Sequence, residues 1–274
     1  MDIKNTLKEN NFKFEKKFGQ NFLTDSNLLN AIVNDCDIEK KDNVLEIGPG
    51  AGALTKFIAE KANKVLCYEI DTNLQPILLT NLKNQTNIEI IFKDIMTIPN
   101  NEISKKLGSN YSIIANLPYY ITTPIIFKFL NDDNVKQMCI MVQKEVAERI
   151  VAKSGKDYGI LSIMVDFCAS AQIKRIVNRN MFTPAPNVDS AIVLITKKKK
   201  LNCDYNLFEK IVQTAFSMRR KTLVNNLSNG LNLTKSEAEN LIFPLGKNIR
   251  GENLSTNDYV QLTNKYEILL KNNK

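Results

Sequence analysis

The sequence contains no histidine, and its five cysteines are scattered singly without any C-x-x-C pair. The absence of histidine excludes Ser-His-Asp and Cys-His catalysis, together with the commonest general base. Isolated cysteines with no histidine to complete a zinc site predict reduced thiols and no metal site. Any chemistry that this chain performs must therefore follow another route.

Long apolar segments are also lacking. No apolar run approaches the roughly 18 residues that a membrane helix needs. Met1 to Phe14 contains acids, has no apolar core of a signal peptide and lacks the Arg-rich bias of a transit peptide. We therefore expect a monomeric cytoplasmic protein without membrane association. Of the 274 residues 43% are hydrophobic, which is enough to bury a sizeable core in one domain plus a smaller one.

Positive charge is concentrated near the C-terminus. The net charge is +8, and residues 197–274 hold 14 lysines and arginines against 7 acids, so they carry +7 of it. A basic segment beside a nearly neutral one favours nucleic acid as the partner. A solvated lysine-rich face is the alternative explanation of the same composition.

The most informative stretch is VLEIGPGAGALT, residues 44–55, where an apolar run leads into three closely spaced glycines and then into helix-forming sequence. This pattern predicts a strand, a tight turn and a helix. Glycines allow positive φ and close approach of a ligand, and the next helix offers free N–H groups at its N-terminus. The loop therefore predicts a nucleotide-like ligand.

The loop alone leaves three interpretations open. Gly48, Gly50 and Ala53 satisfy the dinucleotide pattern G-x-G-x-x-[G/A], with Glu69 following 21 residues after the first glycine. Glu46 and a third glycine complete E-x-G-x-G-x-G instead, which resembles the first motif of methyltransferases that use S-adenosylmethionine (SAM). A turn without a ligand is the third interpretation.

Apolar runs alternate with helical patterns through the first half of the chain. Runs at 65–70, 88–92, 111–115 and 138–142 predict further strands, and two more are expected at 173–177 and 191–196. This alternation predicts a mostly parallel doubly wound sheet whose last pair is antiparallel. Ligands of such sheets bind at the carboxyl ends of the strands. Four residues fall at such ends: Gly48, Glu69, Asp94 and Asn116.

Beyond Lys197 to Lys200 the pattern becomes purely helical, with a capping box at Thr234 to Glu237. We therefore predict two domains, a ligand-binding catalytic domain at 1–199 and a small helical RNA-binding domain at 200–274. Residues 1–20 are polar and are interpreted as an arm or lid. Residues 159–168 are apolar on nearly every side, so periodicity does not separate a buried helix from a strand.

The polar residues at the strand ends suit the methylation of an adenine amine. Glu69 can accept hydrogen bonds from ribose hydroxyls, and Asp94 can accept one from an adenine amino group. In Asn116-Leu117-Pro118-Tyr119, the Asn side-chain carbonyl and a backbone carbonyl before or at the proline can both accept N–H bonds of an exocyclic amine. The aromatic ring that follows can stack on an extruded base through its face. Ordinary helix caps and turns are the alternative for these residues.

A family resemblance rests on several motifs together. They are FGQNFL at 18–23, EIGPGAGALT at 46–55, Glu69, Asp94, NLPY at 116–119, QKEVAERI at 143–150, FTPAPNVDS at 182–190 and RRKTLVNNL at 219–227. In this combination the chain resembles bacterial small-subunit rRNA adenine N6,N6-dimethyltransferases, the kasugamycin-sensitivity family. The resemblance spans about residues 12–255 and implies a Rossmann-like SAM-dependent fold.

The resemblance also implies the reaction. Two methyl groups pass from SAM to each of two adjacent adenosines in a hairpin near the 3′ end of 16S rRNA, late in small-subunit assembly.

The expected roles fall into three sets. The first two are carried over by motif, and the third follows from the basic charge of the C-terminal segment. The SAM contacts are Asn21, Leu23, Gly48, Gly50, Glu69, Asp94 and Asn116. The groups on the target amine and base are Asn116, Pro118, Tyr119 and Phe182, the two rings forming an aromatic sandwich. The expected RNA contacts are Arg219, Arg220 and Lys221.

Two related functions remain as alternatives. Erythromycin-resistance methyltransferases resemble the chain in the glycine loop and the NLPY motif but modify large-subunit rRNA, and they lack the RRKTL stretch and RGENLS at 250–255. A non-catalytic assembly or transcription factor could retain the fold, although intact Asn116, Tyr119 and Glu69 argue against this. A dehydrogenase is disfavoured because nothing resembles a hydride-transfer site.

Overall fold

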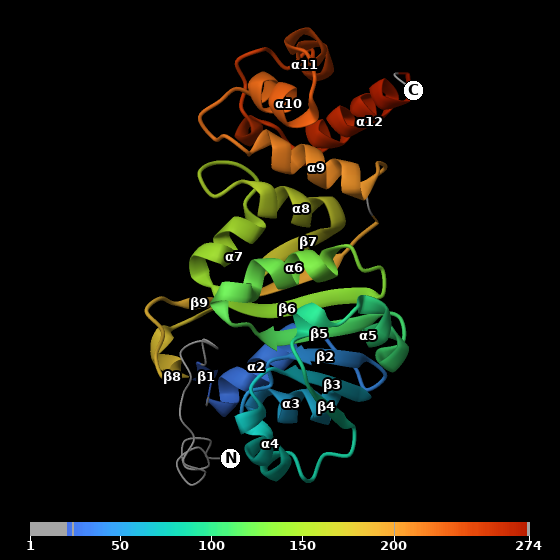
Figure 1. Ribbon diagram of the computed structural model, residues 1–274. Helices are drawn as coiled ribbons and strands as arrows, with labels where there is room; N and C mark the ends of the chain where they lie inside the picture. Colours follow the sequence, from blue (N-terminus) through green and yellow to red (C-terminus); the bar gives the residue numbers. More distant parts are fainter. Residues whose placement is uncertain (1–20, 24, 200, 273–274) are drawn as a thin grey trace. The chain divides into compact units, whose positions relative to one another are not determined.

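The computed structural model describes residues 21–23, 25–199 and 201–272 (Figure 1). The predicted arm at 1–20 lies outside the described residues. A seven-stranded sheet has the order β4-β3-β2-β5-β6-β9-β7, and a separate two-stranded sheet pairs β1 with β8. The strands are β1 (Phe22–Leu23), β2 (Asn43–Ile47), β3 (Lys64–Glu69), β4 (Ile88–Phe92), β5 (Tyr111–Asn116), β6 (Val135–Gln143), β7 (Ala169–Val177), β8 (Phe182–Thr183) and β9 (Ser190–Lys197).

Helices connect most of these strands. The α-helices are α2 (Ser26–Asp35), α3 (Ala53–Lys61), α4 (Gln75–Asn81), α5 (Asn100–Leu107), α6 (Thr122–Leu130), α7 (Lys144–Val151), α8 (Ile160–Cys168), α9 (Tyr205–Ala215), α10 (Leu223–Leu231), α11 (Lys235–Ile242) and α12 (Thr256–Asn272). Short 3-10 turns are η2 (Thr72–Leu74), η3 (Ile95–Thr97), η4 (Tyr119–Ile121), η5 (Arg179–Met181) and η6 (Gly251–Asn253).

The sheet is parallel from β4 to β6, as predicted. The strands β2, β3 and β4 follow one another outward in one direction, and β5 and β6 follow on the other side of β2. The chain order therefore reverses between β2 and β5. In open α/β sheets this reversal opens a crevice beyond the carboxyl ends of the strands, which is where ligands bind.

Both faces of the inner strands β2, β3, β5, β6 and β9 are buried, which explains why these strands are almost continuously apolar. The edge strands differ, since β4 is half-buried and β7 is largely exposed. Val44, Cys67, Ile114 and Met141 point to one face and join a core cluster with α2 and α3. The residues that alternate with them, such as Leu45, are equally buried on the opposite face, and α5 and α6 contact strands β2, β3 and β6.

The prediction gave the last two strands as an antiparallel pair, and the structure adds their order in the sheet. Strand β9 runs antiparallel to β6, with Gln143 opposite Ser190 and Gln137 opposite Thr196. It lies between β6 and β7, so β7 is the edge strand. Because β9 runs against its neighbour, its first residue lies beside the carboxyl end of β6.

The described chain divides into two compact units. The first comprises the described residues up to Ala147 together with Ala171–Lys197, and the second comprises Glu148–Ser170 and the described residues from Lys198 onward. The chain leaves the first unit for the last time after Lys197, which is close to the predicted boundary at 199. Glu148–Ser170 groups with the C-terminal helices, whereas the sequence prediction assigned this segment to the first domain. The functional division between the two domains stays a prediction.

Aromatic packing explains why α8 belongs to the second unit. The ring of Phe167 on α8 stacks on Phe208 of α9 with centroids 4.1 Å apart. Tyr158 donates a hydrogen bond from its hydroxyl to the Leu254 carbonyl at 2.9 Å. The segment 159–168, which the sequence left open between helix and strand, forms the helix α8 from Ile160 to Cys168.

The predicted capping box of α11 is present, since the Thr234 and Glu237 side chains each accept the other's backbone N–H. Within the described residues, no helix is both long enough and apolar enough to cross a membrane.

Candidate active site

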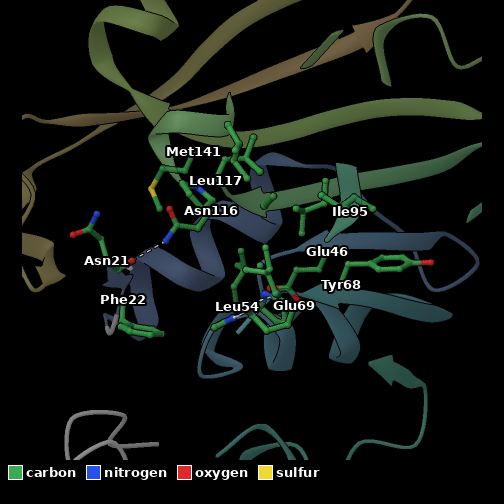
Figure 2. Close-up of a pocket in the computed structure, with 18 of the residues that line it drawn as sticks. Asn21, Phe22, Glu46, Leu54, Tyr68, Glu69, Ile95, Asn116, Leu117 and Met141 are labelled. Carbon is green, nitrogen blue, oxygen red and sulfur yellow. Dashed lines mark hydrogen bonds between the residues drawn. The ribbon is translucent and has the colours of Figure 1, made fainter. Parts of the chain in front are cut away.

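One cavity of about 270 Å³ lies at the carboxyl ends of β2, β3, β4 and β5 in the first unit (Figure 2). The four strand-end residues Gly48, Glu69, Asp94 and Asn116 all line it. Asn21, Leu23, Gly50, Pro118 and Tyr119 line it as well. The structure thus brings nearly all residues predicted for cofactor and target amine into one space.

Glu69 organises the floor of this cavity. Its Oε2 accepts the Gly50 N–H at 3.0 Å, and its Oε1 accepts the N–H groups of Ile70 and Asp71, both at 2.9 Å. The first of these bonds joins the end of β3 to the glycine loop after β2. Gly50 has a φ of +59°, which the residue adopts without strain because it has no side chain.

The Glu69 carboxylate keeps some acceptor capacity for a ligand. Burial raises the pKa of Glu69, and its three N–H donors act in the opposite direction. An ionised carboxylate offers about four acceptor positions, of which the backbone occupies three. One position remains for a ribose hydroxyl, so the residue fits its predicted role.

Asp94 follows β4 and has a similar arrangement. One of its oxygens, Oδ1, accepts the Met96 N–H at 2.8 Å and caps the turn η3. The cap interpretation of Asp94 is therefore correct, and the same side chain also lines the cavity. Ile70 and Ile95, which each follow an acid, line the cavity too and supply apolar surface beside both carboxylates.

The Asn116 amide has a defined orientation. Its Nδ2 donates to the backbone carbonyl of Asn21 at 3.0 Å, a contact drawn in Figure 2. This bond fixes which end of the amide faces Asn21. Among the residues that the structure describes, no donor lies at hydrogen-bond distance from the side-chain oxygen, so this oxygen can accept from a target amine. The predicted cofactor residue Asn21 thus acts here through its main chain.

The structure favours Leu117 over Pro118 as the backbone acceptor. The Pro118 carbonyl already accepts the Ile121 N–H at 3.2 Å and the Thr122 hydroxyl at 3.3 Å. Within the described part of the chain, the Leu117 carbonyl meets no donor at hydrogen-bond distance, and Leu117 lines the cavity. The sequence argument left open whether the acceptor is the carbonyl of Leu117 or that of Pro118. The turn after Pro118 already uses the Pro118 carbonyl.

The two rings predicted to stack on the base differ in position. Tyr119 is half-buried and lines the cavity, and its hydroxyl lies 2.8 Å from Ser190 Oγ. Phe182 is 5% exposed, belongs to the core cluster and pairs with Leu23 between β8 and β1. Of these two residues, Tyr119 lines the cavity and Phe182 does not.

Glu46 is a cavity residue that the sequence argument used only as part of the glycine motif. It is 1% exposed, lines the cavity and lies 3.6 Å from the Cys67 thiol. Burial raises the pKa of Glu46 to about 8. The site therefore holds a third carboxyl group beside those of Glu69 and Asp94, and burial makes it keep its proton to a higher pH than an exposed acid does.

The predicted RNA-binding residues lie in the second unit. Arg219, Arg220 and Lys221 are exposed on the loop between α9 and α10. The buried Asn226 amide holds this loop by donating to the carbonyls of Ala215 at 2.7 Å and Met218 at 3.2 Å. In the described part of the protein none of the three cations forms an ion pair, so their charge is available to a partner.

A Rossmann-like sheet with a glycine loop, acids at successive strand ends and an Asn-Leu-Pro-Tyr turn defines the class of the protein as a methyltransferase. The model of the family "Ribosomal RNA adenine dimethylase" matches residues 11–267. The ribosomal RNA small subunit methyltransferase A of Bacillus cytotoxicus is 41% identical over 274 residues, which cover 95% of this chain and 94% of the relative. The chain belongs to the ribosomal RNA adenine dimethylase family.

Solved structures agree with this assignment. A dimethyladenosine transferase from Plasmodium falciparum superimposes with a TM-score of 0.77 at 26% identity, covering 90% of this chain and 98% of that one. The 23S rRNA methyltransferase ErmE has a TM-score of 0.70 at 23% identity, with 90% and 100% covered. The second likeness concerns the fold alone, so the fold does not separate small-subunit from large-subunit enzymes.

The raised pKa of Glu46 leads to a prediction about stability. The unfolded chain releases this proton near the ordinary value of 4.5, whereas the folded protein keeps it to about 8. The stabilisation from the bound proton is full below pH 4.5 and is lost as the pH rises through about 8. We expect Glu46→Gln to remove this loss, which amounts to up to about 1.4 kcal/mol per pH unit.

The measurement is urea unfolding at several pH values between 4.5 and 8.5. Glu60→Gln, which changes an exposed acid on α3, serves as the control and should keep the slope of the unmodified protein. Parallel pH profiles for Glu46→Gln and the unmodified protein would show that Glu46 is ionised in the folded state.

Proposed function

We propose that the protein is a SAM-dependent adenine N6,N6-dimethyltransferase of the small ribosomal subunit. In this proposal it transfers two methyl groups to each of two adjacent adenosines in a hairpin near the 3′ end of 16S rRNA. The observation that carries the proposal is that Asn116, with its amide oriented, opens on the same cavity as Glu69 and Asp94. It acts as a monomer in the cytoplasm on the assembling subunit.

The residues of the cavity fit SAM. Glu69 has an acceptor position for the ribose, Asp94 has one oxygen beyond its cap for the adenine amino group, and Ile70 and Ile95 offer apolar walls for the ring. The glycine loop and Asn21–Leu23 line the remaining side. When bound, the cofactor supplies an electrophilic methyl group on a sulfonium sulfur.

The target amine is oriented by two oxygens. In the first transfer Asn116 Oδ1 and the Leu117 carbonyl would accept its two N–H bonds, and in the second transfer one of them would accept the single N–H that is left. The lone pair then faces the methyl group, and in each round the S–CH3 bond breaks, the N–CH3 bond forms and one amine proton passes to solvent. An amine conjugated to a purine is a poor nucleophile, so this alignment is the main contribution of the protein to the chemical step. We therefore assign the acceptor role that was first given to Pro118 to the Leu117 carbonyl. Pro118 shapes the turn.

Tyr119 supplies the stacking surface for the extruded base. Stacking of a base on an aromatic ring is worth roughly 1–3 kcal/mol, which helps to offset the cost of removing the base from its helix. Phe182 can form the other side of a sandwich only if its ring leaves the packing between β8 and β1.

The cofactor assignment is tested by calorimetry. We expect SAM and its demethylated product to bind the unmodified protein and NADH not to bind. Glu69→Ala should weaken SAM binding about 10- to 100-fold, because a hydrogen bond to a charged group is lost. It should also lower the melting temperature, since three backbone N–H groups lose their acceptor. If NADH binds and SAM does not, the cofactor assignment is wrong and a dinucleotide site of the dehydrogenase type is favoured.

The catalytic assignment is tested with Asn116→Ala. We expect kcat for methylation of unmethylated small subunits to fall at least about 100-fold, with SAM and subunit binding nearly unchanged, because alignment acts mainly in the transition state. Near-normal turnover of this variant would refute the role of Asn116. Methylation of large-subunit rRNA, or of no RNA, by the unmodified protein would favour one of the two alternative functions.

The RNA-binding assignment is tested by replacing Arg219, Arg220 and Lys221 together with alanine. Phosphate contacts release counterions, so the slope of log affinity against log salt should fall in magnitude by about 2 and small-subunit binding should weaken. SAM binding should not change. A triple variant of the exposed lysines Lys210, Lys235 and Lys271 removes the same charge from the same unit and is the control. Equal losses of small-subunit affinity in both triple variants would mean that the net charge of the unit, and not this loop, determines binding.

A further inference from the structure

Ser190 lies at the active-site edge although it is 74 residues from Asn116 in the sequence. It is the first residue of β9, is fully buried and stands opposite Gln143 at the end of β6. The pairing continues beyond the strand, because Lys144 N–H donates to the Asp189 carbonyl at 3.0 Å. The position of Ser190 is thus fixed by the backbone on both sides.

The direction of β9 explains this location. In the parallel part of the sheet only the last residue of a strand reaches the carboxyl edge, where Glu69 and Asn116 lie. An antiparallel strand reaches the same edge with its first residue. Ser190 therefore lies beside Asn116 to Tyr119, the catalytic turn of the proposed function. A search of the sequence for polar residues at the ends of parallel strands does not find it.

The Ser190 hydroxyl contacts the tyrosine of the catalytic turn. Its Oγ lies 2.8 Å from the Tyr119 hydroxyl, and either atom can be the donor. A tyrosine side chain has two torsions, and its hydroxyl lies on the axis of the second. A bond at the hydroxyl therefore fixes the first torsion, which sets where the ring lies and along which direction its axis points. Burial raises the pKa of Tyr119, so the phenol keeps its proton for this bond at neutral pH.

We propose that Ser190 is a positioning residue that holds the Tyr119 ring at the place where it can stack on the target adenine. This inference rests on the proposed function and adds to it a role for the tyrosine hydroxyl. The ring face contacts the base, and the hydroxyl fixes the axis and position of the ring. Ser190 itself touches neither substrate nor cofactor.

The experiment is a double-mutant cycle on methylation of unmethylated small subunits at saturating SAM. Ser190→Ala and Tyr119→Phe each remove the bond and should lower kcat about 3- to 10-fold, the effect of one neutral hydrogen bond. The double variant should be no slower than either single variant, because both remove the same interaction. The dissociation constant for SAM should stay within about twofold of the unmodified value.

Ser112→Ala is the matched control. Ser112 is also a fully buried strand serine, but its Oγ has no partner within the described residues and it lies at the start of β5. This variant should keep the unmodified kcat. Unfolding curves of all variants separate a change in rate from a change in stability.

Several results would overturn the inference. An unchanged kcat for Ser190→Ala, or losses that multiply in the double variant, would show that the two hydroxyls act independently. If Ser190→Ala does not fold, Tyr119→Phe breaks the bond with Ser190 intact, and a normal kcat there refutes the role. The proposed function still stands after each of these outcomes if the unmodified protein methylates small subunits and Asn116→Ala does not.

Discussion

The hydrogen bond from the Gly50 N–H to Glu69 Oε2 connects the two strand ends on which the cavity depends. It links the glycine loop after β2 to the turn after β3, while Ile70 and Asp71 donate to the other oxygen of the same carboxylate. A single buried side chain thus holds two loops and still offers an acceptor position to a ligand. In the proposed function, the cofactor contact and the local structure are therefore not separable at Glu69.

The catalytic turn is held from outside by two contacts of high sequence separation. Asn116 donates to the Asn21 carbonyl at the N-terminal side, and Tyr119 meets Ser190 on β9. Within the turn, Pro118 accepts from Ile121 and Thr122, which leaves the Leu117 carbonyl for a substrate. Such preorganisation suits a reaction in which the protein contributes alignment and no general base of the histidine type.

Charge and catalysis lie in different parts of the chain. The cavity belongs to the first unit and is lined mainly by apolar residues and carboxyl groups, whereas the exposed cations of the loop after α9 belong to the second. Buried Asn226 holds that loop through two backbone carbonyls. In the proposed function, changes to the loop should therefore weaken RNA binding without altering the cofactor site, since the cavity lining and the loop share no residue.

The sequence by itself determined the alternation of strands and helices and placed Gly48, Glu69, Asp94 and Asn116 at one edge, because hydrophobic period and strand ends are local features. Only the tertiary structure decided that 160–168 is a helix, because the segment is apolar on nearly every side and is buried on nearly every side, so its sequence has no period to read. The partners of the catalytic turn, such as Ser190, also required the structure. They follow from strand order, direction and register, which bring together residues far apart in the chain and leave no local pattern.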